Sequence, residues 1–261
     1  MKVLSIDLDY IMGSVINLYE DLYNTSNPLM RWKRLYNDET FKESHFYVDN
    51  SALIYCYHLF LKSIKKKRGK KAPSVSFGYD TDSILFSIGD YSDIDLISID
   101  HHDCILGCGT NEGLGDKSDD DPEEEYEYVQ NNRVNEGNWV AWLHCNNKLN
   151  SYTWIHNSTN DTKDEFGQNL LGFKQNLLGE KYKQYLREDF SFDNYNFDHV
   201  FVCLSPKYIP KNHWHYFTMF MMTYDEIIGK DINFITQKKF QHHIKFKKTT
   251  NELTDISFDG D

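Results

Sequence analysis

The segment 94–106 most constrains the fold of this chain, because a buried strand in it runs directly into ionisable side chains. Its first half, Ile94–Ile99, is apolar and β-branched, as in the inner strands of a parallel sheet. The strand is followed, without a turn signal, by Asp100, His101, His102 and Asp103. Such a group at a strand end is costly unless its charge is compensated. Ligands and metals bind at the carboxyl ends of strands in open α/β sheets, so we expect a metal site here and not merely a solvated strand end.

A second predicted strand end carries matching carboxylates. Residues 2–8 are expected to form a short buried strand that ends in Asp7 and Asp9, and these two side chains face the same side. Side-chain alternation likewise puts Asp100 and His102 on one side of their strand end. Carboxylates beside an imidazole suit manganese or zinc. We therefore expect these four residues to share one metal site, with the two strands next to each other.

Other polar residues follow predicted elements and are further candidates for the site. Strand 75–79 ends in Asp80-Thr81-Asp82, where Asp82 is equally compatible with a site role and with capping the predicted helix 84–88. Asn138 and Trp139 precede a short apolar segment. They form either a polar and aromatic wall of the site or an ordinary junction between a loop and a helix.

The remaining pattern predicts a single α/β domain over residues 1–261, with a mostly parallel sheet. Further elements are expected as helices at 10–23, 51–64 and 213–222 and as strands at 152–155 and 198–204. Segment 161–183 is polar and expected at the surface. An acidic surface loop is expected at about 111–130, and the end of the chain is a polar tail.

Charge and cysteine content restrict the partners and the compartment. The net charge of −12 argues against a general nucleic-acid binder and is compatible with a basic substrate. The five cysteines are an odd number in mostly apolar surroundings, which indicates buried thiols in a reducing cytoplasm. No apolar run reaches membrane-spanning length and no signal peptide is recognisable, so we expect a cytoplasmic protein that does not bind membranes.

Six short stretches, in this order along the chain, together resemble the peptide arginase family, which is allied to the wider arginase and histone-deacetylase fold. They are Ser5-Ile6-Asp7-Leu8-Asp9-Tyr10, Asp82-Ser83-Ile84-Leu85, Ile99-Asp100-His101-His102, Gly137-Asn138-Trp139-Val140, Tyr152-Thr153-Trp154-Ile155 with Asn157, and Val202-Cys203-Leu204-Ser205-Pro206. Each stretch alone is a weak signal, whereas the ordered set is fairly specific and covers most of the chain.

The resemblance implies a three-layer fold with a central, mostly parallel sheet and a binuclear manganese site at the strand ends. Peptide arginases hydrolyse the guanidinium group of an arginine in a ribosomally made precursor peptide, which releases urea and leaves ornithine. By the resemblance, the metal ligands are Asp7, Asp9, Asp100 and His102, with Asp103 as a further candidate. Asp80, Asp82, His101, Asn138 and Trp139 are candidates for catalysis or substrate binding.

The chain departs from the family pattern at three positions. Thr81 replaces a histidine, Asp103 replaces another histidine, and Cys104 replaces the last ligand carboxylate. In the family, the histidine replaced by Thr81 and the carboxylate replaced by Cys104 are ligands of the same metal. The resemblance therefore implies one firmly bound Mn²⁺, and a second that is bound weakly or through Asp80, Asp103 or Cys104.

Two other functions are compatible with these residues. A DHH-type phosphoesterase uses Asp-x-Asp, a later Asp and Asp-His-His in this order, but the first strand lacks the histidine of its first motif and the chain is short for its second domain. A non-enzymatic peptide-binding relative with a vestigial metal site would explain the missing ligands. The surviving ligands disfavour it, because unpaired buried carboxylates destabilise a fold.

Overall fold

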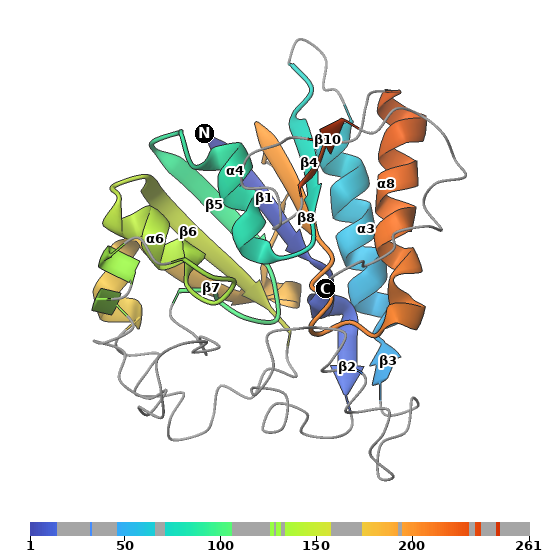
Figure 1. Cartoon of the computed structure of the whole chain (residues 1–261), viewed down its shortest axis with the longest axis horizontal. Coiled ribbons are helices and arrows are strands. Elements are labelled where there is room, and N and C mark those ends of the chain that lie inside the picture. Colours follow the sequence, from blue (N-terminus) through green and yellow to red (C-terminus); the bar gives the residue numbers. More distant parts are fainter. Residues whose placement is uncertain are drawn as a thin grey trace, which may run out of the picture.

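Strands from both ends of the chain join in one eight-stranded sheet, seen in the computed structural model of Figure 1. The structure describes residues 1–14, 32, 46–65, 71–105, 126–127, 129–131, 134–157, 174–192, 195–229, 233–235 and 244–245. The strand order is β10-β9-β4-β8-β1-β5-β6-β7, and only the β10–β9 pair is antiparallel. The strands are β1 (Lys2–Asp7), β4 (Ser74–Gly78), β5 (Ile94–Ile99), β6 (Leu149–His156), β7 (Tyr182–Leu186), β8 (His199–Cys203), β9 (Asn233–Ile235) and β10 (Ile244–Lys245).

Helices cover both faces of this sheet, which gives three layers, as expected. Helices α3 (Asn50–Ile64) and α8 (His215–Ile228) lie on one face, and the shorter α4 (Leu85–Ile88) and α6 (Trp139–Cys145) lie on the other (Figure 1). Side-chain alternation along β1 explains the two cores. Leu4 and Ile6 belong to the α3/α8 core, whereas Val3 belongs to the α4/α6 core.

Short 3-10 turns and a small hairpin complete the described fold. The turns are η1 (Leu8–Ile11), η3 (Thr81–Ile84), η4 (Gly179–Lys181), η5 (Arg187–Asp189) and η6 (Lys211–His213). Strands β2 (Met12–Ser14) and β3 (Phe46–Val48) pair in antiparallel fashion outside the main sheet. No helix in the described ranges is long and apolar enough to cross a membrane.

The arrangement of β1 brings the predicted site together. β1 lies between β5 and β8, with Ile6 opposite Ile99 on one side and Asp7 opposite Cys203 on the other. Since β4 pairs in parallel with β8, four carboxyl ends meet at the same edge of the sheet. The prediction that the strands at 2–8 and 94–99 lie next to each other is confirmed.

The structure also corrects some predicted elements. A helix was expected over 10–23, but residues 8–14 form η1 and β2, because Met12 pairs with Val48 of a distant strand. Residues 15–23 lie outside the described part. Segment 161–183 was expected at the surface; residues 161–173 lie outside the described part, and in the remainder Lys174 is buried and Tyr182 begins β7. Nearly all of the acidic loop at 111–130 and the tail after residue 245 also lie outside the described residues.

Candidate metal centre

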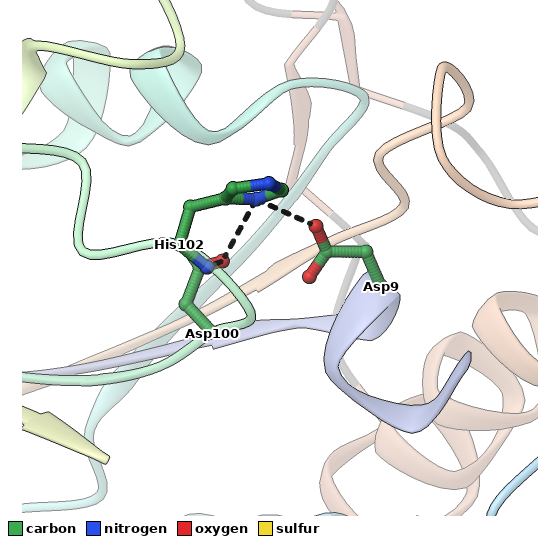
Figure 2. Close-up of side chains that lie close together, drawn as sticks. All are labelled: Asp9, Asp100 and His102. Carbon is green, nitrogen blue, oxygen red and sulfur yellow. Dashed lines mark hydrogen bonds and ion pairs between the residues drawn. The ribbon is translucent and has the colours of Figure 1, made fainter. Parts of the chain in front are cut away.

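Asp9, Asp100 and His102 meet at the carboxyl ends of β1 and β5, as Figure 2 shows. One ligand atom from each residue lies within 4.8 Å of the other two. His102 Nδ1 is 3.2 Å from Asp9 Oδ2 and 3.9 Å from Asp100 Oδ1. Both carboxylates are buried, whereas the imidazole is 38% exposed. The group therefore has a closed carboxylate side and an accessible imidazole side.

Tight local turns place these side chains after the strands. The carboxylate of Asp7 accepts a hydrogen bond of 3.0 Å from the backbone N–H of Asp9, two residues on. Asp100 likewise accepts a bond of 2.8 Å from the N–H of His102. Aspartate favours this kind of turn because its short side chain reaches the backbone two residues further. The N–H of His101 donates to Asp9 Oδ1 at 3.3 Å, which links the two strand ends.

Burial and neighbouring charges shift the pKa values of the groups at this centre. Burial, and next the charge of Asp9, raise the pKa of Asp100 to about 8. Burial also raises the pKa of Asp7 well above its usual range, with Asp9 and Asp100 adding to the effect. Burial alone would lower the pKa of His102, but its bond to Asp9 and the nearby carboxylates outweigh this and raise it. In the metal-free chain these shifts favour the protonated forms of Asp7 and Asp100, whereas a nearby cation would favour their carboxylates.

The chemistry of the donors fits a divalent metal ion. Asp9 Oδ2 is buried, and within the described residues its one close partner is the imidazole Nδ1 of His102 at 3.2 Å. A divalent cation would compensate this buried carboxylate more fully than a single imidazole does. Two carboxylates with one imidazole suit manganese or zinc. Asp9, Asp100 and His102 are therefore the residues that would hold the ion.

Asp7, expected as a fourth ligand, lies outside this group of three. Its Oδ2 accepts a short hydrogen bond of 2.6 Å from Ser205 Oγ, and its Oδ1 accepts the N–H of Asp9. Both oxygens are thus engaged by the protein. In this structure Asp7 positions Asp9 and joins the ends of β1 and β8.

Asp103 and Cys104 also have partners within the protein. Lys174 Nζ lies 2.8 and 2.9 Å from the two oxygens of Asp103, so this expected ligand is held in a buried ion pair away from the group. Cys104 Sγ donates to Asp100 Oδ2 at 3.3 Å. Burial and the charge of Asp100 raise the pKa of Cys104 well above its usual range, which keeps the thiol protonated.

The end of β4 carries further polar residues at the same edge of the sheet. Thr81 Oγ1 donates to the carbonyl of Glu136 at 3.1 Å, and Glu136 forms an ion pair of 2.7 Å with Lys207. Burial, followed by the charges of Glu136 and Asp82, raises the pKa of Asp80 to about 8. Asp82 lies within the turn η3 and not at its start, so it does not cap the helix as one prediction had it.

Asn138 and Trp139, expected beside the substrate, are fully buried. Trp139 packs in the α4/α6 core, and Asn138 Oδ1 accepts a bond of 2.8 Å from the N–H of Asn135. They form the junction between a loop and helix α6, the alternative weighed for them. His101 packs against His102 with 5.0 Å between ring centroids, and burial lowers its pKa to about 4.

Sequence patterns missed several residues that shape the centre. Ser205 was named only within the stretch Val202–Pro206 of the family resemblance, without a role, and Lys174 lay in a segment without apolar periodicity, which gave no signal. Tyr208 has its ring 5.0 Å from that of His102. Glu136 and Lys207 come from loops distant in the sequence, so only the fold shows that they pair.

Comparison of the chain with protein-family models, with curated proteins and with solved structures finds no match. The resemblance to peptide arginases rests on the short motifs named above. The case for a metal centre rests on the geometry of Asp9, Asp100 and His102.

Proposed function

We propose that this chain is a hydrolase that depends on a divalent metal ion held by Asp9, Asp100 and His102. The observation that carries the proposal is the convergence of these three side chains, two of them buried carboxylates, at the carboxyl ends of adjacent parallel strands. A divalent ion bound there supplies Lewis acidity, which lowers the pKa of a water molecule and makes it a nucleophile.

The chain's own residues would hold and orient the reacting groups. Asp7 and Ser205 fix the position of Asp9 through two hydrogen bonds. The ring of Tyr208 packs against that of His102 and would help to hold the imidazole in place. Such rigid support of the ligands is what a hydrolytic centre requires.

The substrate that we propose is an arginine residue in a ribosomally made precursor peptide, with Mn²⁺ as the ion. The ordered motifs that resemble peptide arginases support this choice. The net charge of −12 would favour a cationic side chain. Carboxylate donors are also suited to manganese.

Mass spectrometry of peptides tests this function. The Mn²⁺-loaded protein is incubated at low salt with a panel of arginine-containing peptides, and conversion of arginine to ornithine with release of urea is expected. Peptides with lysine in place of arginine and the variant Asp9→Asn serve as controls, and neither should give urea. A protein that binds Mn²⁺ but leaves every peptide unchanged would contradict the arginase function. Hydrolysis of a model phosphodiester in the same assay would favour the phosphoesterase alternative.

A further inference from the structure

We infer that this centre holds one divalent ion and that Lys174 supplies, from within the protein, the positive charge that a second ion would bring. The inference rests on the proposed function, because it concerns the same metal centre. It departs from the binuclear site of the peptide arginase family and from the weakly bound second ion that the resemblance leaves open for this chain. Three contacts carry it, and each occupies a side chain at a position where the family pattern has, or could recruit, a ligand for the second ion.

The first contact is the buried ion pair between Asp103 and Lys174. Lys174 Nζ binds both carboxylate oxygens at 2.8 and 2.9 Å, and each side chain is only 9% exposed. The N–H of Ile105 donates to the same carboxylate at 3.2 Å, and Tyr152 Oη donates to the backbone carbonyl of Asp103 at 2.6 Å. Turning Asp103 toward a metal would leave a buried ammonium without its partner, which is strongly unfavourable.

The second contact directs Asp100 toward a single ion. Its Oδ2 accepts the Cys104 thiol at 3.3 Å, whereas its Oδ1 lies on the side of His102. A carboxylate bridge in which each oxygen binds one ion would require Asp100 Oδ2 to give up its hydrogen bond from the Cys104 thiol. The third contact is at Thr81, whose hydroxyl donates to the carbonyl of Glu136. The thiol of Cys104 and the hydroxyl of Thr81 are thus both engaged in hydrogen bonds within the protein, and neither is placed to act as a ligand of a second ion.

Formal charge agrees with one ion. The buried carboxylates that follow β1 and β5 are Asp7, Asp9, Asp100 and Asp103, with four negative charges when all are ionised. One divalent ion and the Lys174 ammonium bring three positive charges, and Ser205 and a backbone N–H donate hydrogen bonds to Asp7. Two divalent ions together with Lys174 would bring five positive charges, more than these four carboxylates carry, so a second ion would have to displace Lys174 from Asp103. Burying excess positive charge is as costly as burying excess negative charge.

The number of bound ions tests the inference directly. The metal-free protein is titrated with Mn²⁺ by calorimetry, and the ions retained after equilibrium dialysis are counted by elemental analysis. The wild-type chain should bind one ion, with no second binding event. The double variant Lys174→Met with Cys104→Asp frees Asp103 and adds a carboxylate, so a second ion should bind. Aspartate tolerates the left-handed backbone at position 104, where φ is 52°. Lys207→Met, which breaks the ion pair with Glu136, is the matched control and should still bind one ion.

A second variant covers the case in which the first does not fold. Lys174→Met with Asp103→Asn removes both charges together and leaves no buried ion unpaired. It should still bind one ion with unchanged affinity, because Asp103 is not a ligand. Two ions in the wild-type chain, or loss of the ion in this neutral variant, would overturn the inference. One bound ion without urea release would defeat only the proposed function, whereas urea release with two bound ions would defeat only the inference.

Discussion

At the scale of single residues, the centre brings buried carboxyl groups so close together that their negative charges repel one another. Asp100 is fully buried, and its pKa of about 8 shows how strongly its surroundings disfavour the carboxylate. Asp100→Asn keeps the shape of the side chain and removes its charge. We expect this variant to lose ion binding in calorimetry, while the metal-free variant unfolds at the same temperature as the metal-free wild type or above it.

Asp95→Asn is the matched control, because Asp95 lies on the same strand, β5, and is hydrogen-bonded to Asn150 and Ser151 far from the centre. It should bind the ion as the wild-type chain does. If Asp100→Asn retained full affinity for Mn²⁺, Asp100 would not be a ligand.

His199, at the amino end of β8, makes the stability of the chain depend on pH. Its ring nitrogens lie 2.7 Å from Ser74 Oγ and 2.9 Å from Ser76 Oγ, and burial lowers its pKa from 6.5 to about 4. Because the unfolded chain binds this proton more readily than the folded chain, the stabilisation contributed by neutral His199 is fully present above pH 6.5. It is lost progressively as the pH falls toward 4. The difference between the two pKa values corresponds to about 3 kcal/mol.

Urea unfolding at several pH values measures this effect. His199→Asn is expected to unfold more easily at pH 7, but its stability should fall less between pH 6.5 and pH 4 than that of the wild-type chain. His58→Asn, at an exposed position on α3, should follow the wild-type curve. Parallel curves for His199→Asn and the wild-type chain would show that the histidine is not buried in its neutral form.

At the scale of elements, helix α3 depends on its cap. Asp49 accepts hydrogen bonds from the N–H groups of Ser51 at 2.8 Å and Ala52 at 3.1 Å, and it lies 3.5 Å from Arg187. Asp49→Ala should lower the free energy of unfolding by about 1 kcal/mol, mainly through loss of the cap. Glu188→Ala removes the other carboxylate near Arg187 without touching the helix, and exposed ion pairs contribute less. Equal losses for both variants in urea unfolding would show that Arg187, and not the cap, accounts for the effect.

The same scale shows which elements were predictable. Strands β1, β5 and β8 are short apolar runs, buried on both faces, and they were predicted within one or two residues. The helical spacing at the start of 10–23 was misleading, because β2 forms only through its pairing with β3 more than thirty residues later. Local patterns carry no information about such distant pairing.

At the scale of the whole molecule, the centre is a product of topology. Asp9, Asp100 and His102 were predicted as neighbours because both strand ends were recognisable in the sequence and parallel strands end at one edge. The partners of Asp7 and Asp103 were not predicted, because Ser205 and Lys174 reach them from segments 198 and 71 residues away in the sequence. Only the folded chain shows that these two aspartates are already bonded within the protein.

Because the ion would bind the folded chain and not the unfolded one, it should stabilise the whole molecule. A Mn²⁺ concentration about one hundred times the dissociation constant adds about 2.7 kcal/mol to the free energy of unfolding. For a domain of this size each kcal/mol raises the melting temperature by roughly 2–4 °C, so a rise of about 5–10 °C is expected in thermal unfolding. The stabilisation should grow with the logarithm of the Mn²⁺ concentration, as binding at a specific site requires. Asp9→Asn should show no rise, whereas Asp95→Asn should rise as the wild-type chain does. Equal stabilisation of both variants would mean that the ion acts elsewhere, since only Asp9 belongs to the group of three ligands.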